Sequence, residues 1–254
     1  MQKEIDIRRK ENEKRFIAIT SGRSPMPTLK YVGDDLEESL RKIRNNESGT
    51  IVVSFHTKSY FLLLQFLLEV NIPCIAITTE ALSKRLNHSK YMPPKGLEFS
   101  ATLGRKELKK CINNECILFI MADVLIDYAS NTWIPLQNKC VRYTISWAEL
   151  AYKLKLNVFT TILKEQNNTA TVHLKSFGNF HSSVTQLVYS VFDTFGSFIE
   201  KDIIFWENYP EWQATGITLP PLDKGLTEEL LATLYDLAVC DQTVINILRN
   251  QVNQ

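Results

Sequence analysis

The chain has 254 residues, 44% of them hydrophobic and 22% charged, which is enough to bury a core as one large α/β domain or two small ones. Its 29 basic and 28 acidic residues give a net charge of +1, so the overall charge gives no reason to expect a nucleic-acid partner. The five cysteines lack both C-x-x-C pairing and the density of a secreted disulfide scaffold, which favours reduced thiols in a cytoplasmic protein.

The amino-terminal region is charged throughout its first fifteen residues, which predicts a solvated helix or a frayed terminus rather than a signal peptide. The longest apolar stretch, Tyr60 to Val70, is interrupted by Gln65 and is too short to span a bilayer. We therefore expect no integral membrane segment.

Strands and helices are predicted to alternate in the first half of the chain. The predicted elements are a helix over Leu36–Ile43, a strand over Ile51–His56, a helix from there to Val70, a strand over Cys74–Thr79, a polar stretch over Asn87–Gly96, a helix over Lys106–Ile112 and a strand over Cys116–Met121 that closes at Asp123. This alternation is typical of an α/β protein.

The second half of the chain is predicted to hold three helices and a hairpin. These are a helix over Ser146–Leu156, a hairpin of Val158–Leu163 and Thr169–Lys175 around Asn167 and Asn168, and helices over Ser182–Glu200 and Leu226–Val252. We expect a single α/β domain over residues 1–254, with a mixed central β-sheet flanked by helices on both faces. A proline-rich stretch over Gly216–Gly225 is predicted to attach residues 226–253 as a C-terminal helix packed on that domain.

His56 is the first candidate for a catalytic residue. It ends a predicted buried strand, and strand ends are where α/β proteins place their chemistry. We expect the following helix to begin at once, with Thr57 or Ser59 as its N-cap. The helix dipole at that position would disfavour a standing imidazolium, which suits a general base. The alternative is a histidine that merely ends a buried strand.

Six short segments between about Leu29 and Gln213 are similar, in their order, to blocks of one known family. They are Tyr31-Val32-Gly33 with Leu36 to Leu40, Ile51 to His56, Ile72 to Ile77, Leu108 to Cys111 through Phe119 to Asp123, Thr144 to Ala151, and Tyr209 to Trp212. With these segments the chain resembles the lysophospholipid acyltransferase superfamily, in the branch of the lipid A lauroyl and myristoyl transferases. The resemblance implies a glycerolipid acyltransferase-like fold.

The sequence departs from that family at Phe61. The family's histidine is followed, after four residues, by an aspartate or glutamate that orients the imidazole, and a phenylalanine cannot do so. We expect Asp123, or else Asp127, to supply the carboxylate, with Glu69 further away; otherwise the base works without an acid. A turn or helix cap is the alternative role for Asp123. Phe61 itself is expected to narrow the pocket beside His56.

The resemblance implies an acyltransferase. In such a reaction an acyl, aminoacyl or peptidyl group moves from a carrier-protein or coenzyme A thioester to a hydroxyl or amine, with His56 as general base. Lys58 or Arg105 would hold the oxyanion or the phosphate of the phosphopantetheine arm, unless they are ordinary solvated charges. Ser54 shares a strand face with His56, so a Ser–His pair is conceivable, although a core hydroxyl is the commoner role.

No bound cofactor is expected beyond the phosphopantetheine of the donor. His88, His173 and His181 show no metal-ligand spacing. Because lipid A transferases carry a membrane helix that is not evident here, we expect a small soluble acceptor and a biosynthetic role, with an acyl or peptidyl carrier protein as partner. The alternative is a degenerate member that binds a carrier protein or acyl chain without catalysis, a reading that Phe61 favours.

Overall fold

The computed structural model describes most of the chain between residues 28 and 199, with short pieces on either side. The described residues are 7, 10–15, 17–18, 23, 28–32, 36–45, 48–57, 60–69, 71–80, 83–84, 95–126, 129–136, 139–166, 169–179, 181–199, 206, 208, 212–213 and 215–218. The predicted helix over 226–253 and the hairpin turn at 167–168 lie outside them.

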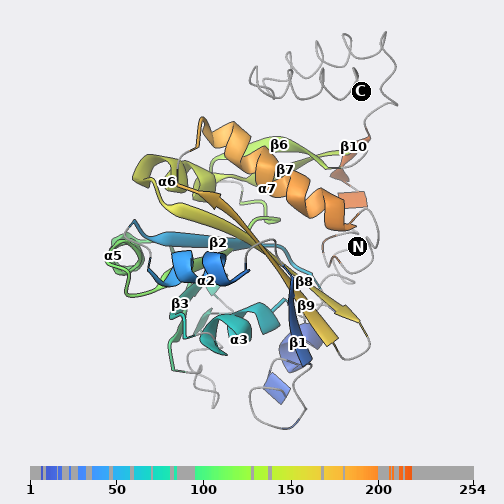
Figure 1. Ribbon diagram of the computed structural model, residues 1–254. Coiled ribbons are helices and arrows are strands. Elements are labelled where there is room, and N and C mark those ends of the chain that lie inside the picture. The colour runs from blue at the N-terminus through green and yellow to red at the C-terminus, as the bar shows by residue number, and fades with distance from the viewer. Residues whose placement is uncertain are drawn as a thin grey trace.

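The main sheet has seven strands in the order β1-β9-β8-β2-β5-β3-β4 (Figure 1). Their bounds are β1 Thr28–Val32, β2 Thr50–Ser54, β3 Cys74–Ile77, β4 Leu97–Ser100, β5 Ile117–Met121, β8 Asn157–Gln166 and β9 Thr169–Gly178. From β8 to β4 all neighbours are parallel, whereas β9 is antiparallel to β8 and parallel to β1. The predicted mixed sheet is confirmed, and so is the predicted β8–β9 hairpin.

Helices cover both faces of this sheet, as predicted (Figure 1). The helices are α2 Leu36–Arg44, α3 Leu62–Glu69, α5 Arg105–Ile112, α6 Ser146–Leu154 and α7 Val184–Ile199. Apolar residues of α2 and α3 form a core on one face, and those of α6 and α7 pack on the other. None of the described helices is long and apolar enough to cross a membrane.

The central strands are buried on both faces. Every residue of β2 is buried; Val52 contributes to the core under α2 and α3, whereas Ile51 and Val53 contribute to the core under α6 and α7. Such continuous apolar runs are what a parallel sheet covered on both sides requires. The core thus holds the ends of β2 and its neighbours in fixed positions.

A second, three-stranded antiparallel sheet packs beside α7 (Figure 1). It consists of β6 Asn131–Leu136, β7 Lys139–Thr144 and β10 Ile217–Thr218, in the order β10-β7-β6. The sequence interpretation missed this sheet and also β1 and β4. Pro135 falls within β6, and proline normally counts against a strand unless that strand lies at a sheet edge, as β6 does.

The chain between His56 and α3 also differs from expectation. α3 begins at Leu62, and a turn precedes it in which the Tyr60 N–H donates to the Thr57 carbonyl at 3.1 Å. Thr57 forms a β-bridge with Trp206 instead of capping a helix. The prediction that His56 lies at a helix N-terminus is therefore wrong, and the helix dipole gives no reason for its basicity.

Candidate active site

His56 and Asp123 each lie two residues past the carboxyl end of a strand, in the neighbouring parallel strands β2 and β5. The register of β2 and β5 sets Ser54 against Met121, the last residue of each strand. His56 and Asp123 each follow two residues later, and the Ala122 N–H donates to the Ser54 carbonyl at 2.8 Å, which extends the pairing past the strand ends. The sheet therefore brings together two side chains that are 67 positions apart in sequence.

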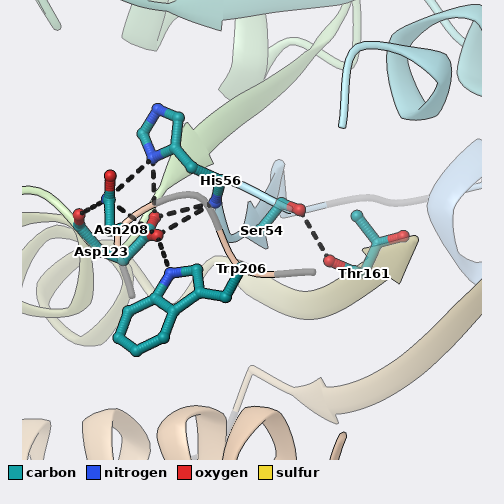
Figure 2. Close-up of polar contacts among 6 residues, drawn as sticks. All are labelled: Ser54, His56, Asp123, Thr161, Trp206 and Asn208. Carbon is teal, nitrogen blue, oxygen red and sulfur yellow. Dashed lines mark hydrogen bonds and ion pairs between the residues drawn. The ribbon is translucent and has the colours of Figure 1, made fainter. Parts of the chain in front are cut away.

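The two side chains are in direct contact (Figure 2). His56 Nδ1 lies 2.9 Å from Asp123 Oδ1. The backbone N–H of His56 also donates to the carboxylate, at 3.1 Å from Oδ1 and 3.0 Å from Oδ2. The predicted contact of Asp123 with His56 is thus confirmed, and the carboxylate holds both the ring and the backbone of the histidine.

Two residues from the far end of the described chain complete the environment of Asp123. Trp206 Nε1 donates to Oδ2 at 2.6 Å, and Asn208 Nδ2 donates to Oδ2 at 3.0 Å and to the Asp123 carbonyl at 2.7 Å (Figure 2). Asn208 Nδ2 also lies 3.5 Å from His56 Nδ1. The sequence interpretation missed both residues, and no local pattern marks them, because their contacts with Asp123 span 83 and 85 positions of the chain.

The Asp123 carboxylate is charged although it is fully buried. Its side chain is 0% exposed, and burial alone would raise its pKa. The His56 charge and the hydrogen bonds from His56 and Trp206 outweigh burial and lower the pKa of Asp123 below its ordinary value of 3.8. A buried carboxylate with this set of donors remains ionised at neutral pH.

The ionised carboxylate selects one tautomer of His56. A carboxylate only accepts hydrogen bonds, so in the neutral ring the proton is on Nδ1, which faces Asp123. The lone pair is then on Nε2, which lies on the far side of the ring from Asp123 (Figure 2). The His56 side chain is 13% exposed, which leaves a path to the ring from outside. The arrangement can take a proton from a bound group and stabilise the resulting imidazolium.

Aromatic packing fixes the backbone that carries His56. Phe55 is fully buried and stacks on Phe195 of α7, with ring centroids 3.8 Å apart and planes 4° from parallel. Phe195 in turn meets the Trp206 ring edge to face at 5.3 Å. The same core that anchors α7 therefore sets the direction in which the chain leaves β2.

Tyr60, and not Phe61, is the aromatic neighbour of the imidazole. The Tyr60 ring lies 5.2 Å from the His56 ring at an angle of 78°, and it is partly exposed. Phe61 is 5% exposed and belongs to the core cluster with α3. The expectation that Phe61 narrows the pocket beside His56 is corrected, because the turn before α3 directs its side chain into the core.

Ser54 does not take part in the site. It is fully buried, and its hydroxyl donates to the Thr161 carbonyl at 2.8 Å, away from the imidazole (Figure 2). Ser54 and His56 have the same parity along the chain, but His56 lies beyond the end of the strand, where face alternation no longer applies. Ser54 therefore forms no Ser–His pair and does not face a substrate; its hydroxyl has the core role that the sequence analysis gave as the commoner one.

Arg105 lies on the same edge of the sheet as His56 but away from it. It is the exposed first residue of α5, which follows the outer strand β4. β4 is three places from β2 in the strand order, or about 14 Å at the usual strand spacing. Lys58 and Asp127, the other two predicted site residues, lie outside the described residues, and so does the side chain of Glu69.

A cavity of about 360 Å³ opens at the opposite edge of the sheet, at the amino ends of β2 and β5. It is lined by Ile43, Arg44, Thr50, Asn71, Ile72, Pro73, Asn114, Cys116 and Ile117. Burial and the neighbouring Cys111 raise the pKa of the Cys116 thiol to about 12, so it is protonated at neutral pH. Within the described part of the chain, no three His, Cys, Asp or Glu side chains form a set of metal ligands.

No protein-family model matches the chain, and a search of curated proteins found no significant match. The resemblance to the acyltransferase superfamily therefore rests only on the short sequence segments that carry it.

Proposed function

We propose that the protein is an acyltransferase in which His56 is the general base and Asp123 orients it. The observation that carries the proposal is the 2.9 Å contact between His56 Nδ1 and the buried Asp123 carboxylate. A histidine oriented in this way has a basic Nε2 and a carboxylate to stabilise its protonated form. The thioester donor is inferred from the family resemblance.

The proposed reaction needs one proton carrier and no covalent enzyme intermediate. His56 Nε2 takes the proton from an acceptor hydroxyl or amine as the acceptor oxygen or nitrogen attacks the thioester carbonyl carbon. When the tetrahedral intermediate collapses, the C–S bond breaks and the sulfur leaves. The imidazolium returns the proton to that sulfur, so a free thiol and an acylated acceptor are formed and His56 is neutral again.

The replacement of the family acid by Phe61 is compatible with this proposal. In the family resemblance the carboxylate follows the histidine along the chain, whereas here Asp123 comes from the neighbouring strand β5. The physical requirement is only that a carboxylate accepts the Nδ1 proton, and either source meets it. The phenylalanine at position 61 therefore does not favour a protein that binds its ligand without catalysis.

We propose the same classes of donor and acceptor that the sequence and its family resemblance predict. The acyl, aminoacyl or peptidyl group would arrive on the phosphopantetheine of a carrier protein or of coenzyme A. The acceptor would be a small hydroxyl or amine metabolite in a biosynthetic pathway. The donor would approach from the side of Nε2, which is the side of the ring away from Asp123 (Figure 2).

The proposal is tested by incubating the full chain with acyl-coenzyme A and acyl-carrier-protein thioesters and a panel of hydroxyl and amine acceptors. Thiol release and the mass of the acylated acceptor are followed for the wild type and for His56→Ala. We expect acceptor-dependent transfer by the wild type, loss of transfer in His56→Ala and no mass increase of the protein itself. Equal transfer by both proteins would refute the role of His56. Binding of the thioester without transfer would favour the non-catalytic alternative.

A further inference from the structure

Trp206 and Asn208, which follow α7 in the chain, contribute two buried hydrogen-bonding side chains to the site. Trp206 is 0% exposed and Asn208 is 1% exposed. The Trp206 backbone forms a β-bridge with Thr57, the residue next to His56, and its ring packs against Phe195. Trp206 is therefore joined to the chain just after β2 by backbone pairing as well as by its side chain.

The hydrogen bonds to Asp123 are distributed unequally between its two carboxylate oxygens. Oδ2 receives the Trp206 indole N–H at 2.6 Å and the Asn208 amide at 3.0 Å, whereas the ring of His56 contacts Oδ1 at 2.9 Å. The His56 backbone N–H donates to both oxygens, at 3.1 Å from Oδ1 and 3.0 Å from Oδ2. Because the backbone N–H is shared by both oxygens, the Trp206 and Asn208 side chains are the donors that distinguish Oδ2 from Oδ1 and hold the rotation of the carboxyl group about its Cβ–Cγ bond. That rotation decides whether Oδ1 faces the imidazole.

We propose that Trp206 and Asn208 are positioning residues that hold the Asp123 carboxylate and, through it, the Nδ1–H tautomer of His56. This inference rests on the proposed role of His56 as general base. Packing alone does not require an indole at position 206, because a phenyl ring would also meet Phe195 edge to face. The indole N–H is the part of Trp206 that reaches the carboxylate.

Trp212 offers a matched control for Trp206. Both tryptophans belong to the same core cluster, their rings lie 6.3 Å apart, and Trp212 is 6% exposed. Trp206→Phe and Trp212→Phe each remove one indole from this core, but only Trp206→Phe removes a donor to Asp123. A purely structural role predicts the same behaviour of the His56 ring in both variants.

The test is the tautomer of the His56 ring, read from long-range ¹H–¹⁵N correlation spectra of the neutral imidazole, with the His56 signals assigned by their loss in His56→Gln. We expect the Nδ1–H form alone in the wild type and in Trp212→Phe, and a mixture of tautomers in Trp206→Phe. A pure Nδ1–H ring in Trp206→Phe would overturn the assignment of Trp206. Asn208→Ala provides the second variant, with the same expected mixture, and it decides the question if Trp206→Phe does not fold.

Kinetics give an independent readout. We expect kcat to fall about 10- to 100-fold in Trp206→Phe with KM changed by less than about 2-fold. A loss of this size is usual when the hydrogen-bond partner that orients a metal-ligating histidine is removed, and we expect the same of a partner that orients a catalytic base. An unchanged kcat in Trp206→Phe and Asn208→Ala would contradict the positioning role. The spectra need no substrate, so a wild type without transfer activity would refute the proposed function while the tautomer comparison still decides the role of Trp206 and Asn208.

Discussion

Beyond the carboxyl ends of β2 and β5 lies a network of polar contacts centred on a buried carboxylate, whereas at their amino ends lies an open cavity of about 360 Å³. The carboxyl edge holds Asp123 ionised through His56 and Trp206, and it leaves Nε2 of the histidine for a reactant. The amino edge has a cavity lined by described residues, but burial raises the pKa of its half-buried thiol, Cys116, and keeps it protonated.

Among the described residues, the cavity at the amino ends and the hydrogen-bonded carboxylate thus lie at opposite edges of the sheet. A reactive group has to be held in a defined protonation state, and that takes fixed donors and acceptors more than volume. In open α/β sheets such groups gather where parallel strands deliver their carboxyl ends to one edge. We therefore expect substitutions at the carboxyl edge to change activity and those at the amino edge to change stability alone.

Asp123→Asn is expected to have the largest effect. The amide keeps the shape of the carboxylate but removes its charge and turns one acceptor into a donor that faces the other donors. We expect kcat to fall on the order of 10²- to 10⁴-fold, the usual contribution of an oriented general base. Steady-state thiol release measures the loss. A fall of less than 10-fold in a folded variant would contradict the orienting role of Asp123.

Phe61→Glu is expected to lower stability without adding activity. Phe61 is 5% exposed in the core cluster with α3, so the new acid would be buried without a partner. We expect the free energy of unfolding to fall by about 2–5 kcal/mol, measured by urea denaturation, with no gain in transfer. An increase in transfer would show that position 61 faces the site after all.

Gly49→Ala probes the amino edge. Gly49 precedes β2 with φ +82°, and a Cβ there would approach the Leu156 side chain to 3.0 Å and the Cys111 carbonyl to 3.1 Å. We expect a loss of about 1–3 kcal/mol in unfolding free energy with kcat unchanged in the folded protein. A large loss of kcat at full stability would contradict the expectation that substitutions at the amino edge change stability alone.

Acidification should affect the wild type more than Asp123→Asn. Because the pKa of Asp123 is lowered below 3.8, the folded protein binds this proton more weakly than the unfolded chain does. The resulting stability is complete well above 3.8 and is lost as the pH falls through the folded pKa, roughly from pH 5 downward. Urea denaturation over this range should show a steeper loss for the wild type. An equal dependence of the unfolding free energy on pH in the two proteins would mean that the carboxylate is not stabilised in its charged form.

Cys116→Ser is expected to have the smallest effect. The thiol lines the cavity at the amino edge and is protonated at neutral pH, so it does not act as a nucleophile there. We expect kcat within about 2-fold of the wild type and a change in unfolding free energy below about 1 kcal/mol. A strong loss of transfer would place the reaction in this cavity and contradict the assignment of activity to the carboxyl edge.

The sequence predicts the parts of this molecule that depend on local pattern or on parallel strand ends. The alternating apolar segments predict the mixed sheet and most of the helices, and the strand ends predict that Asp123 can reach His56. Boundaries fail where tertiary contacts enter, as at Thr57, which pairs with Trp206 where a helix start is predicted, while α3 begins at Leu62.

Residues that act through long-range contacts are not marked in the sequence. Trp206 and Asn208 are separated from Asp123 by 83 and 85 positions, and nothing in their local pattern distinguishes them from other core residues. Strand parity makes a Ser54–His56 pair conceivable, and alignment with the family pattern places Phe61 beside His56. Both expectations assume regular structure through His56, and the turn after β2 breaks that regularity.

The central claim, that His56 Nε2 is the base, is tested most directly by comparing His56→Gln with His173→Gln in the transfer assay, using the donor and acceptor that the wild type accepts. His173 is a matched control because it is also partly buried beside an aromatic ring, Phe198, with ring centroids 4.4 Å apart. We predict that kcat/KM falls at least about 100-fold in His56→Gln and stays within about 2-fold in His173→Gln, with both variants folded. A His56→Gln variant that transfers as fast as His173→Gln would contradict the account.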